Sequence, residues 1–333
     1  MAVSNLFASN VMTQRDATLP PLRIGYARGS APEILGEPDV LAAIGFDDAH
    51  GAIDDPRWLA VGLDAIGPPA IEVWRATGPI RSGRHGRVRW STDGDYGFFA
   101  IEVEEAGEDI AAAAETAYRE IVPVIHRSAT PHVLRLWNYF DAINEGDGDE
   151  ERYRRFCVGR ARGMEGVWRD RYPAATAIGR RDGVRVLQVY ALAARTAGSP
   201  VENPRQVNAW RYPREYGPTP PTFARGMATP AGQLLISGTA AVVGSASRHH
   251  DDVAAQLDET LTNVESLIRT AGTNGTTAPG PGSLLKAYVR DANHAPLVLA
   301  KLSEAMGAAD GILVLGGDIC RRELLVEIDG VHA

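Results

Sequence analysis

One amphipathic helix limits the possible folds of this chain more than any other segment. Residues 251–271 carry apolar side chains at spacings of three and four, namely Val253, Leu257, Leu261, Val264 and Ile268. Asp251 and Asp252 stand at the N-terminal end, where the helix dipole favours negative charge. A helix with one apolar stripe has to bury that stripe, so we predict that this helix lies against a sheet.

The rest of the chain mixes helical and extended patterns in the same way. Apolar spacing predicts a long helix over 108–126, and shorter helices are predicted over 150–162 and 295–306. Short runs bounded by Gly, Pro and Asp predict strands at 22–27, 58–61, 87–90, 96–104, 132–137, 184–192, 206–212, 233–237, 284–290, 312–315 and 324–328. Because strict βαβ alternation is missing, we predict an α+β fold rather than a doubly wound sheet.

The length of the chain predicts more than one domain. With 333 residues it exceeds the usual size of a single hydrophobic core. A polar, glycine-rich turn at 144–149 is the predicted boundary between two mixed-sheet domains packed with helices, over 21–147 and 148–333. Residues 1–20 are predicted to form a flexible leader.

Composition argues against several classes of function. A net charge of -8 and a pI near 5.5 disfavour binding to nucleic acid, which needs a basic surface. The two cysteines lack the spacing of a zinc site, and the sequence contains no nucleotide-binding motif. We therefore expect that the protein uses neither a metal nor a cofactor. The sequence has no apolar segment typical of a signal peptide or of a membrane-spanning helix, so we expect a cytoplasmic protein that does not bind a membrane. We also expect a monomer or a small homo-oligomer that binds a small molecule.

The last predicted strand places one acid among apolar neighbours. In the run ELLVEIDG at 323–330, Glu327 follows closely behind Cys320. A carboxyl group near hydrocarbon keeps its proton longer than one in water, so Glu327 could act as a general acid near neutral pH. However, Leu324, Val326 and Ile328 alternate along one face, and Glu327 could point to solvent from the other. The strand alone leaves both orientations open.

Two C-terminal stretches resemble the Rid/YjgF fold. They are LISGTA at 235–240 with QLDETLTNV at 256–264, and LVEID at 325–329. The resemblance implies a Rid-type fold for the predicted C-terminal domain, which would carry the catalytic site. Rid deaminases carry a carboxylate-binding arginine about fifteen residues before the matching glutamate, and here Ile312 stands there. This departure argues against an imine deaminase.

From about Leu22 onward, the whole chain resembles the chorismatases, which remove pyruvate from chorismate. Several uncommon strings carry this likeness in the same order: RLWNY at 135–139, IN at 143–144, RYRRFCVGR at 152–160, NPRQV at 203–207, RYPREYGP at 211–218, FAR at 223–225, SGT at 237–239 and GDICRR at 317–322. The resemblance implies a cofactor-independent enzyme in which Glu327 protonates the enolpyruvyl methylene of chorismate and then, as a carboxylate, stabilises the oxocarbenium ion.

A dianionic substrate requires cationic and neutral hydrogen-bond donors. The Arg/Tyr-rich stretch 210–225 is the predicted carboxylate clamp, with Tyr212, Tyr216 and Arg225 as the chosen residues and Arg160 as a second clamp. Read without the resemblance, the same arginines would be a solvated loop and the polar face of a helix. Ser237, Gly238, Thr239 and Ala240 complete the predicted substrate site, although Ser237 and Thr239 could simply bond to local backbone groups.

The resemblance gives two conflicting indications of the ring product. A cysteine near the catalytic glutamate, here Cys320, is associated with members that yield 3-hydroxybenzoate, and this is the predicted product. Ala240 fits instead the hydrolytic members, which yield 3,4-dihydroxycyclohexa-1,5-diene carboxylate. Without the resemblance, Cys320 would be an inert buried residue. A hypothesis of another class is a noncatalytic Rid-like protein that only binds a small acid.

Overall fold

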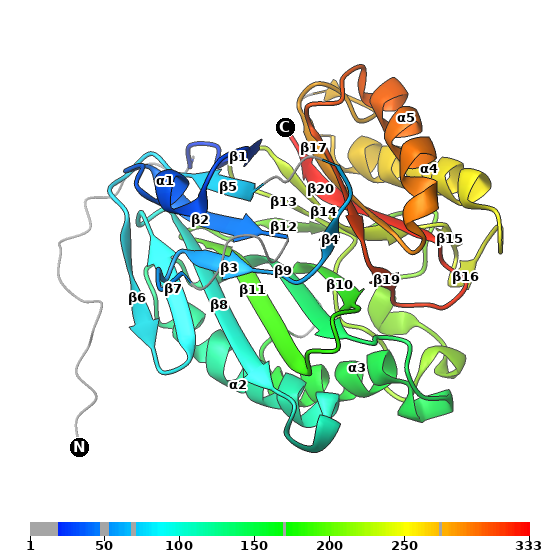
Figure 1. The fold of residues 1–333 in the computed structure, drawn as a ribbon, viewed down its shortest axis with the longest axis horizontal. Helices are drawn as coiled ribbons and strands as arrows, with labels where there is room; N and C mark the ends of the chain where they lie inside the picture. The colour runs from blue at the N-terminus through cyan, green and yellow to red at the C-terminus, as the bar shows by residue number, and fades with distance from the viewer. Residues whose placement is uncertain (1–18, 47–52, 68–70, 169–170, 273–274) are drawn as a thin grey trace.

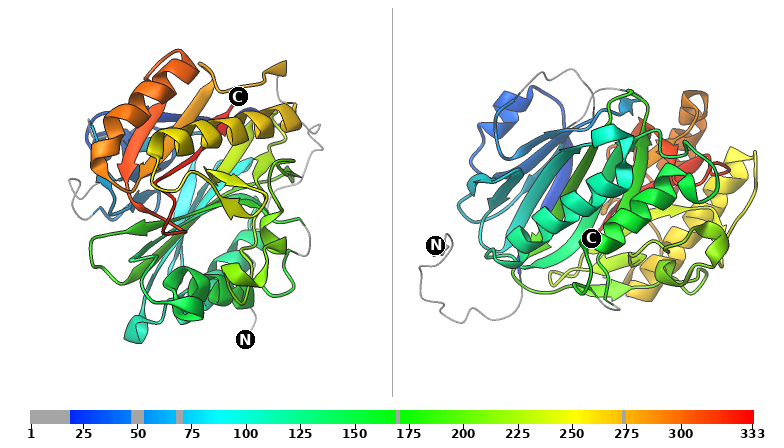
Figure 2. Two further views of the ribbon diagram at one scale, coloured as in Figure 1. Left: turned by 90° about the vertical axis from the view of Figure 1, so that its right-hand side faces the viewer. Right: turned by 90° about the horizontal axis from the view of Figure 1, so that it is seen from below.

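The structure is a computed structural model that describes residues 19–46, 53–67, 71–168, 171–272 and 275–333. Two seven-stranded mixed sheets form its centre, and each carries two helices on one face (Figure 1). The left view of Figure 2 shows α4 and α5 on one side, the strands in the middle, and α2 and α3 on the opposite side. The predicted α+β class with mixed sheets is confirmed.

Helices α2 (Ile110–His126) and α3 (Arg152–Gly163) pack against one face of the first large sheet. Its strands, in spatial order, are β19 (Asp318–Ile319), β10 (Ala174–Arg180), β9 (His132–Asp141), β11 (Val186–Ala194), β8 (Tyr96–Glu104), β7 (Val88–Thr92) and β6 (Arg81–His85). The apolar stripe of α2, which includes Ile121 and Ile125, packs against Leu136 of β9 and Val189 of β11. Burial of this stripe joins helix and sheet into one core.

The second large sheet carries helices α4 (Val253–Ala271) and α5 (Ala295–Met306). Its order is β12 (Ser199–Val201), β13 (Gly226–Ala228), β14 (Leu234–Ala240), β20 (Val326–His332), β17 (Ser283–Val289), β18 (Ile312–Gly316) and β4 (Asp64–Ala65). Asp252 caps α4 by accepting a hydrogen bond from the backbone N–H of Ala255, and Gly272 ends the helix in the left-handed conformation. The helix predicted from sequence over 251–271 is thus confirmed.

Smaller elements complete the fold. A four-stranded sheet contains β1 (Arg23–Ala27), β5 (Ile71–Arg75), β2 (Val40–Gly45) and β3 (Trp58–Ala60), with α1 (Ala31–Leu35) against it. A hairpin pairs β15 (Val242–Val243) with β16 (Ala246–Ser247), and single 3-10 turns occupy Ala106–Glu108, Gly148–Glu150, Ala209–Arg211, Arg214–Tyr216 and Ala292–His294.

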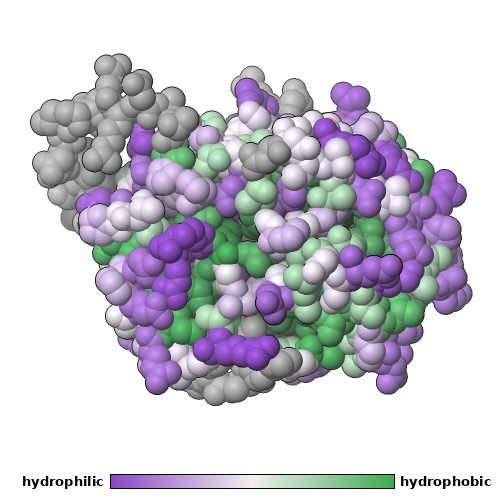
Figure 3. Space-filling view, turned by 90° about the horizontal axis from the view of Figure 1, so that it is seen from above, coloured by the Kyte–Doolittle hydropathy of each residue, from purple (hydrophilic) through white to green (hydrophobic). Residues whose placement is uncertain are grey.

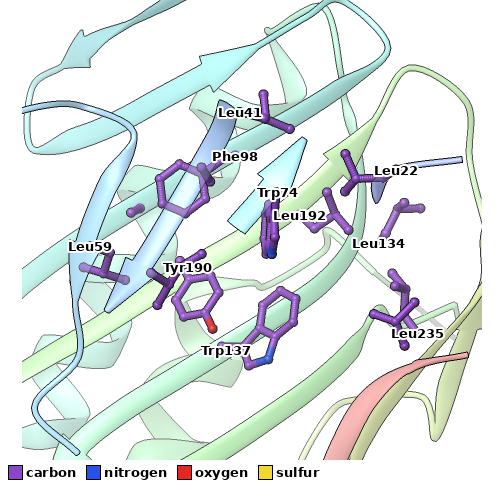
Figure 4. Close-up of a cluster of buried hydrophobic side chains, with 14 of the residues drawn as sticks. Leu22, Leu41, Leu59, Trp74, Phe98, Leu134, Trp137, Tyr190, Leu192 and Leu235 are labelled. Carbon is purple, nitrogen blue, oxygen red and sulfur yellow. The ribbon is translucent and has the colours of Figure 1, made fainter. Parts of the chain in front are cut away.

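The main apolar core lies between the sheets. Trp137 and Tyr190 of the first sheet stack at 4.7 Å between ring centroids, and Trp74 of the small sheet packs onto both (Figure 4). Leu235 and Tyr288 of the second sheet join the same cluster. The second large sheet and the small sheet together cover the inner face of the first large sheet, so the side chains of its central strands are buried on both faces.

One predicted strand differs from the structure. The strand predicted over 206–212 is wrong: Gln206 forms one isolated bridge to Gly244, and a 3-10 turn follows at Ala209–Arg211. The leader predicted over 1–20 lies outside the described residues except for its last two, of which Leu19 is buried in the core.

Strand pairing crosses the predicted domain boundary at residue 147. β9 precedes it and β10 follows it, yet they pair in parallel, and β11 pairs with β8 from the other side of the boundary. The division into domains stays a prediction, and its proposed position gains no support from these pairings.

The described surface mixes polar and apolar side chains. On the face shown in Figure 3, hydrophilic and hydrophobic residues are interspersed. The large apolar side chains that are exposed in the described part of the chain are Val184, Val207, Leu297 and Leu299. Among the described helices, none combines the length and the apolar character needed to cross a membrane.

Candidate active site

Two adjoining cavities gather most of the predicted site residues where the two large sheets meet. The outer cavity measures about 510 Å³, and its lining includes Glu327, Cys320, Tyr212, Tyr216, Arg225, Gly238 and Ala240. The inner cavity, of about 40 Å³, shares Glu327, Cys320 and Gly238 with the outer one and is also lined by Arg160, Asn138 and Thr176. Segments distant in sequence therefore converge on Glu327.

The position of β20 decides the orientation of Glu327. Val326 and Ile328 pack into the cluster beneath α4 and α5, with Leu257 and Val298. Side chains alternate along a strand, so Glu327 points to the opposite face, toward the first sheet. Glu327 is only 5% exposed because both faces of β20 are covered. The alternative that it points into bulk solvent is therefore wrong.

A β-bulge in β14 makes room for the carboxyl group. Ile236 pairs with Gly330 and Thr239 with Ile328, so two residues, Ser237 and Gly238, lie opposite the single Asp329. A Cβ atom at position 238 would overlap Oε1 of Glu327. A glycine at this point of the bulge thus lets the acid lie directly against the backbone.

Burial makes Glu327 a weak acid. Loss of solvation raises its pKa to about 8, and the nearby negative charge of Asp329 adds to this shift. Arg225 and Arg135 act in the opposite direction. No hydrogen bond or ion pair joins its carboxyl group to another described residue, so the group stays available to a ligand.

Arg225 presents a buried guanidinium to the outer cavity. Its Nη2 atom donates to the Tyr212 hydroxyl and to the Val207 carbonyl, each at 2.7 Å. Nε is buried without a partner in the described residues. By contrast, Arg211 and Arg214 are exposed, and Arg214 pairs with Asp149 at the surface. The solvated-loop interpretation is therefore right for these two arginines and wrong for Arg225.

Arg160 provides a second buried guanidinium, at the inner cavity. It is 3% exposed and its Nε donates to the Tyr118 hydroxyl at 2.9 Å, while Nη2 is buried without a partner among the described residues. An unpaired buried donor is costly, and an anionic ligand would relieve that cost. Arg160 is not part of a solvated helix face.

Tyr212 and Tyr216 form one wall of the outer cavity together with an arginine that the sequence analysis did not select. The guanidinium of Arg321 lies 3.9 Å from the ring centroid of Tyr216 and 5.0 Å from that of Tyr212. Tyr153, which lines both cavities, was also missed. Both residues belong to the strings that carried the family resemblance, which was the one available signal.

Ser237 and Thr239 are not among the described residues that line either cavity, so their predicted role in substrate binding gains no support from the structure. The Ser237 hydroxyl donates to the Ala224 carbonyl at 2.6 Å and accepts from the backbone N–H of Ala175 at 2.9 Å. The Thr239 hydroxyl donates to the Ser237 carbonyl at 2.8 Å. Both side chains satisfy backbone groups, those of Ala224 and Ala175 for Ser237 and that of Ser237 for Thr239, as the simpler interpretation of these two residues expected.

Cys320 and Ala240 flank the acid from two directions. Burial, and next the charge of Glu327, raise the pKa of the Cys320 thiol, so it remains protonated and is a poor nucleophile. Ala240 lies opposite Glu327 in the register of β14 and β20. The two residues that indicate different ring products therefore both lie next to the proposed proton donor.

A buried charge cluster lies behind Glu327. Arg135 pairs with Asp329 at 3.0 Å, and Lys286 pairs with Glu72 at 2.7 Å. The Tyr288 hydroxyl donates to Asp329 at 2.9 Å. The two cations and two anions of this cluster cancel, so a neutral Glu327 adds no uncompensated charge to the interior.

Comparisons with known proteins agree with the resemblance seen in the sequence. The model of the N-terminal part of FkbO/Hyg5-like chorismatases matches residues 72–193. A chorismatase from Streptomyces rapamycinicus is 35% identical over 94% of this chain and 99% of its own length. A 3-hydroxybenzoate synthase from Streptomyces hygroscopicus is 36% identical over 79% of this chain and 81% of its own length.

One solved structure gives the same result for the fold. A chorismatase crystal structure superposes with a TM-score of 0.84 and 29% identity, covering 96% of this chain and 100% of its own. The Rid-family protein YyfA from Yersinia pestis aligns with 41% of this chain at a TM-score of 0.32.

Proposed function

Because this chain belongs to the chorismatase family and is an enzyme of that type, we propose that it converts chorismate to pyruvate and 3-hydroxybenzoate. The observation that carries the proposal is a buried acid, Glu327, whose pKa burial raises to about 8 and which lines two adjoining cavities. Each cavity also presents one buried guanidinium with an unpaired donor, Arg160 in the inner cavity and Arg225 in the outer one. A general acid beside unpaired cations suits an anionic substrate that reacts by protonation.

Charge balance supports a dianionic substrate. Chorismate carries a ring carboxylate and an enolpyruvyl carboxylate. Arg160 at the inner cavity and Arg225 at the outer one would each bind one carboxylate by donating charge-assisted hydrogen bonds to it. The negative charge of a bound dianion disfavours ionisation of the nearby Glu327, so substrate binding favours the protonated form that the reaction needs.

The chemical step begins with transfer of the Glu327 proton to the terminal methylene carbon of the enolpyruvyl vinyl ether. The carbon–carbon double bond supplies the electron pair, and an oxocarbenium ion remains next to the ether oxygen. The newly formed carboxylate of Glu327 stabilises that positive charge across a site with little water. The oxygen of the ring C4 hydroxyl then attacks C3 and breaks the bond between C3 and the ether oxygen, so pyruvate leaves with that oxygen as its keto oxygen and the hydroxyl proton returns to Glu327. The ring is left as an epoxide, which opens with its oxygen on C3 and loses the C4 hydrogen as a proton, giving 3-hydroxybenzoate.

Two observations bear on the ring product. Cys320 next to Glu327 and the 36% identity to a 3-hydroxybenzoate synthase favour 3-hydroxybenzoate, which forms from chorismate without net consumption of water. Ala240, opposite Glu327, favours the hydrolytic alternative, in which one water is consumed and 3,4-dihydroxycyclohexa-1,5-diene carboxylate is released. Chromatography of the ring product separates the two routes.

The test is a coupled pyruvate assay on the purified protein with chorismate, against chorismate incubated without protein. We expect pyruvate and an equal amount of 3-hydroxybenzoate. Diene product in place of the aromatic acid would select the hydrolytic alternative. Pyruvate no higher than in the protein-free sample would instead support the noncatalytic, small-acid-binding hypothesis.

Ionisation of Glu327 is expected to limit activity at high pH. A general acid works only while it holds its proton, and burial raises the pKa of this one to about 8. The value of kcat/KM, which reports the free enzyme, should be level at neutral pH and fall about tenfold per pH unit above that pKa. A fall that begins near pH 5, the range of an ordinary glutamate, would contradict the buried acid.

Alanine at position 238 is expected to lower activity while leaving the fold intact. The added methyl group overlaps the carboxyl end of Glu327, which is flexible and can turn away. Because misplacement of a reacting group by about 1 Å can cost a hundredfold, kcat of Gly238→Ala should drop by roughly ten- to a hundredfold. Gly25→Ala is the matched control, since nothing lies within 4 Å of that Cβ position. Wild-type kcat in Gly238→Ala would contradict the role of the bulge.

A further inference from the structure

The hydroxyl group of Thr176 in β10 lies where the first large sheet packs against the second. Its Oγ1 accepts a hydrogen bond from Nη2 of Arg135 at 3.0 Å and another from the backbone N–H of Gly238 at 3.1 Å. A hydroxyl has two lone pairs and one hydrogen, so both acceptor positions are occupied. Its own hydrogen can only be donated, and no described residue accepts it.

Both donors to this hydroxyl are held in place. Arg135 is fully buried, pairs with Asp329, donates through Nη1 to the Gly330 carbonyl at 2.7 Å, and lies 4.3 Å from the ring centroid of Trp137. Gly238 belongs to the bulge, where its N–H has no partner in β20. Neither donor can turn away without leaving a buried polar group unpaired, so the direction of the Thr176 hydrogen is restricted.

The free hydrogen can be donated into the inner cavity. Thr176 lines the inner cavity together with Glu327. Its Cγ2 lies 3.5 Å from the Cβ position of Gly238, against which the Glu327 carboxyl group also rests. Its carbonyl is held by Nδ2 of Asn138 at 2.9 Å, which fixes the backbone of β10 at this point. Thr176 and the acid thus approach the same glycine from two sheets.

We infer that Thr176 is a positioning residue for Glu327: it holds the bulge at Gly238 and directs a hydrogen-bond donor toward the carboxylate left after proton transfer. The inference rests on the proposed function for its catalytic consequence. While Glu327 is protonated, the hydroxyl gains little from it. Once the proton has moved to the substrate carbon, the same hydroxyl faces an ionised acceptor, and such hydrogen bonds are about twice as strong. The interaction therefore favours the state after transfer.

Thr176→Val and Thr176→Ser separate the hydroxyl from the packing of the side chain. Valine keeps the shape and removes the hydroxyl, whereas serine keeps the hydroxyl and removes one methyl group. We expect kcat to fall roughly ten- to a hundredfold in Thr176→Val with little change in KM, and to stay within about threefold of wild type in Thr176→Ser. The high-pH limit of activity should move upward in Thr176→Val only, since loss of a donor to the charged form raises the pKa of an acid.

Thr92→Val is the matched control for loss of a buried threonine hydroxyl. Thr92 is also buried, and its Oγ1 accepts from the backbone N–H of Gly94 at 2.9 Å, in a hairpin remote from the cavities. This variant should lose stability without a change in kcat or in the pH profile. Thermal unfolding of all three variants shows whether each protein is folded under assay conditions.

A titration that needs no substrate keeps the inference separate from the proposed function. Carboxyl-carbon NMR with labelled glutamate, with Glu327→Gln identifying the signal, should give a higher pKa for Glu327 in Thr176→Val than in wild type or Thr176→Ser. An unchanged pKa, or a serine variant that behaves like valine, overturns the role of the hydroxyl. A raised pKa in a protein that releases no pyruvate would support the placement of Thr176 and reject the proposed function.

Discussion

Replacing Glu327 by glutamine is expected to lower kcat for pyruvate release by about a hundredfold to ten-thousandfold, the usual contribution of a general acid. This range corresponds to roughly 3 to 5 kcal/mol of transition-state stabilisation. Glutamine keeps the size of the side chain but has no acidic proton to transfer. It also cannot become the anion that stabilises the oxocarbenium ion, so both roles of Glu327 are lost together.

The effect of Glu327→Gln should appear in kcat rather than in KM. Arg160 and Arg225 remain in place in this variant, so the substrate carboxylates keep their partners. Glu304→Gln makes the same chemical change at an exposed residue of α5 that lines neither cavity, and it should leave kcat near the wild-type value. A Glu327→Gln enzyme with more than about a tenth of wild-type activity would fall outside the range for a general acid and contradict the mechanism.

Asp329→Asn is expected to lower the free energy of unfolding by about 3 to 5 kcal/mol, because it leaves a buried charge uncompensated. Asp329 is fully buried and pairs with Arg135 at 3.0 Å and with Lys286 at 3.7 Å. Without its charge, two buried cations would share the single carboxylate of Glu72. Urea unfolding at neutral pH measures the loss.

An exposed ion pair provides the comparison for this variant. Glu120 pairs with Arg87 at the surface, where both side chains are more than one third exposed. Surface pairs contribute at most about 1 kcal/mol, so Glu120→Gln should have a small effect. Equal losses in the two variants would show that the buried cluster tolerates the missing charge and would contradict its assignment as a balanced set.

Local patterns predicted the regular elements well. The helices over Ile110–His126, Val253–Ala271 and Ala295–Met306 match the predicted ranges to within two residues at each end. Helix periodicity depends on neighbours three and four residues apart, so it can be read without knowledge of the fold. The strand predicted over 206–212 was wrong because alternating polar and apolar residues also occur in segments that find no partner strand, and here one isolated bridge at Gln206 is followed by a 3-10 turn.

The residues around Glu327 show that local sequence patterns do not predict which side chains line a cavity. The SGT string at 237–239 drew attention to the right place, yet only Gly238 lines the cavities, because the bulge turns Ser237 and Thr239 to backbone groups. A bulge depends on how two strands pair, and pairing partners are not visible in one strand. The same holds for Arg225 and Arg214, which stand in one arginine-rich stretch and differ in burial.

The sequence by itself determined the mixed helix and strand composition, the family resemblance, and the presence of an acid behind Cys320 in the last strand. Only the tertiary structure decided that this acid lies inside. Alternation along β20 is identical for an edge strand and a central one, and burial of Glu327 arises because a second sheet covers the face that would otherwise meet water. Its raised pKa is therefore a property of two sheets in contact, which residues far apart in the chain create together.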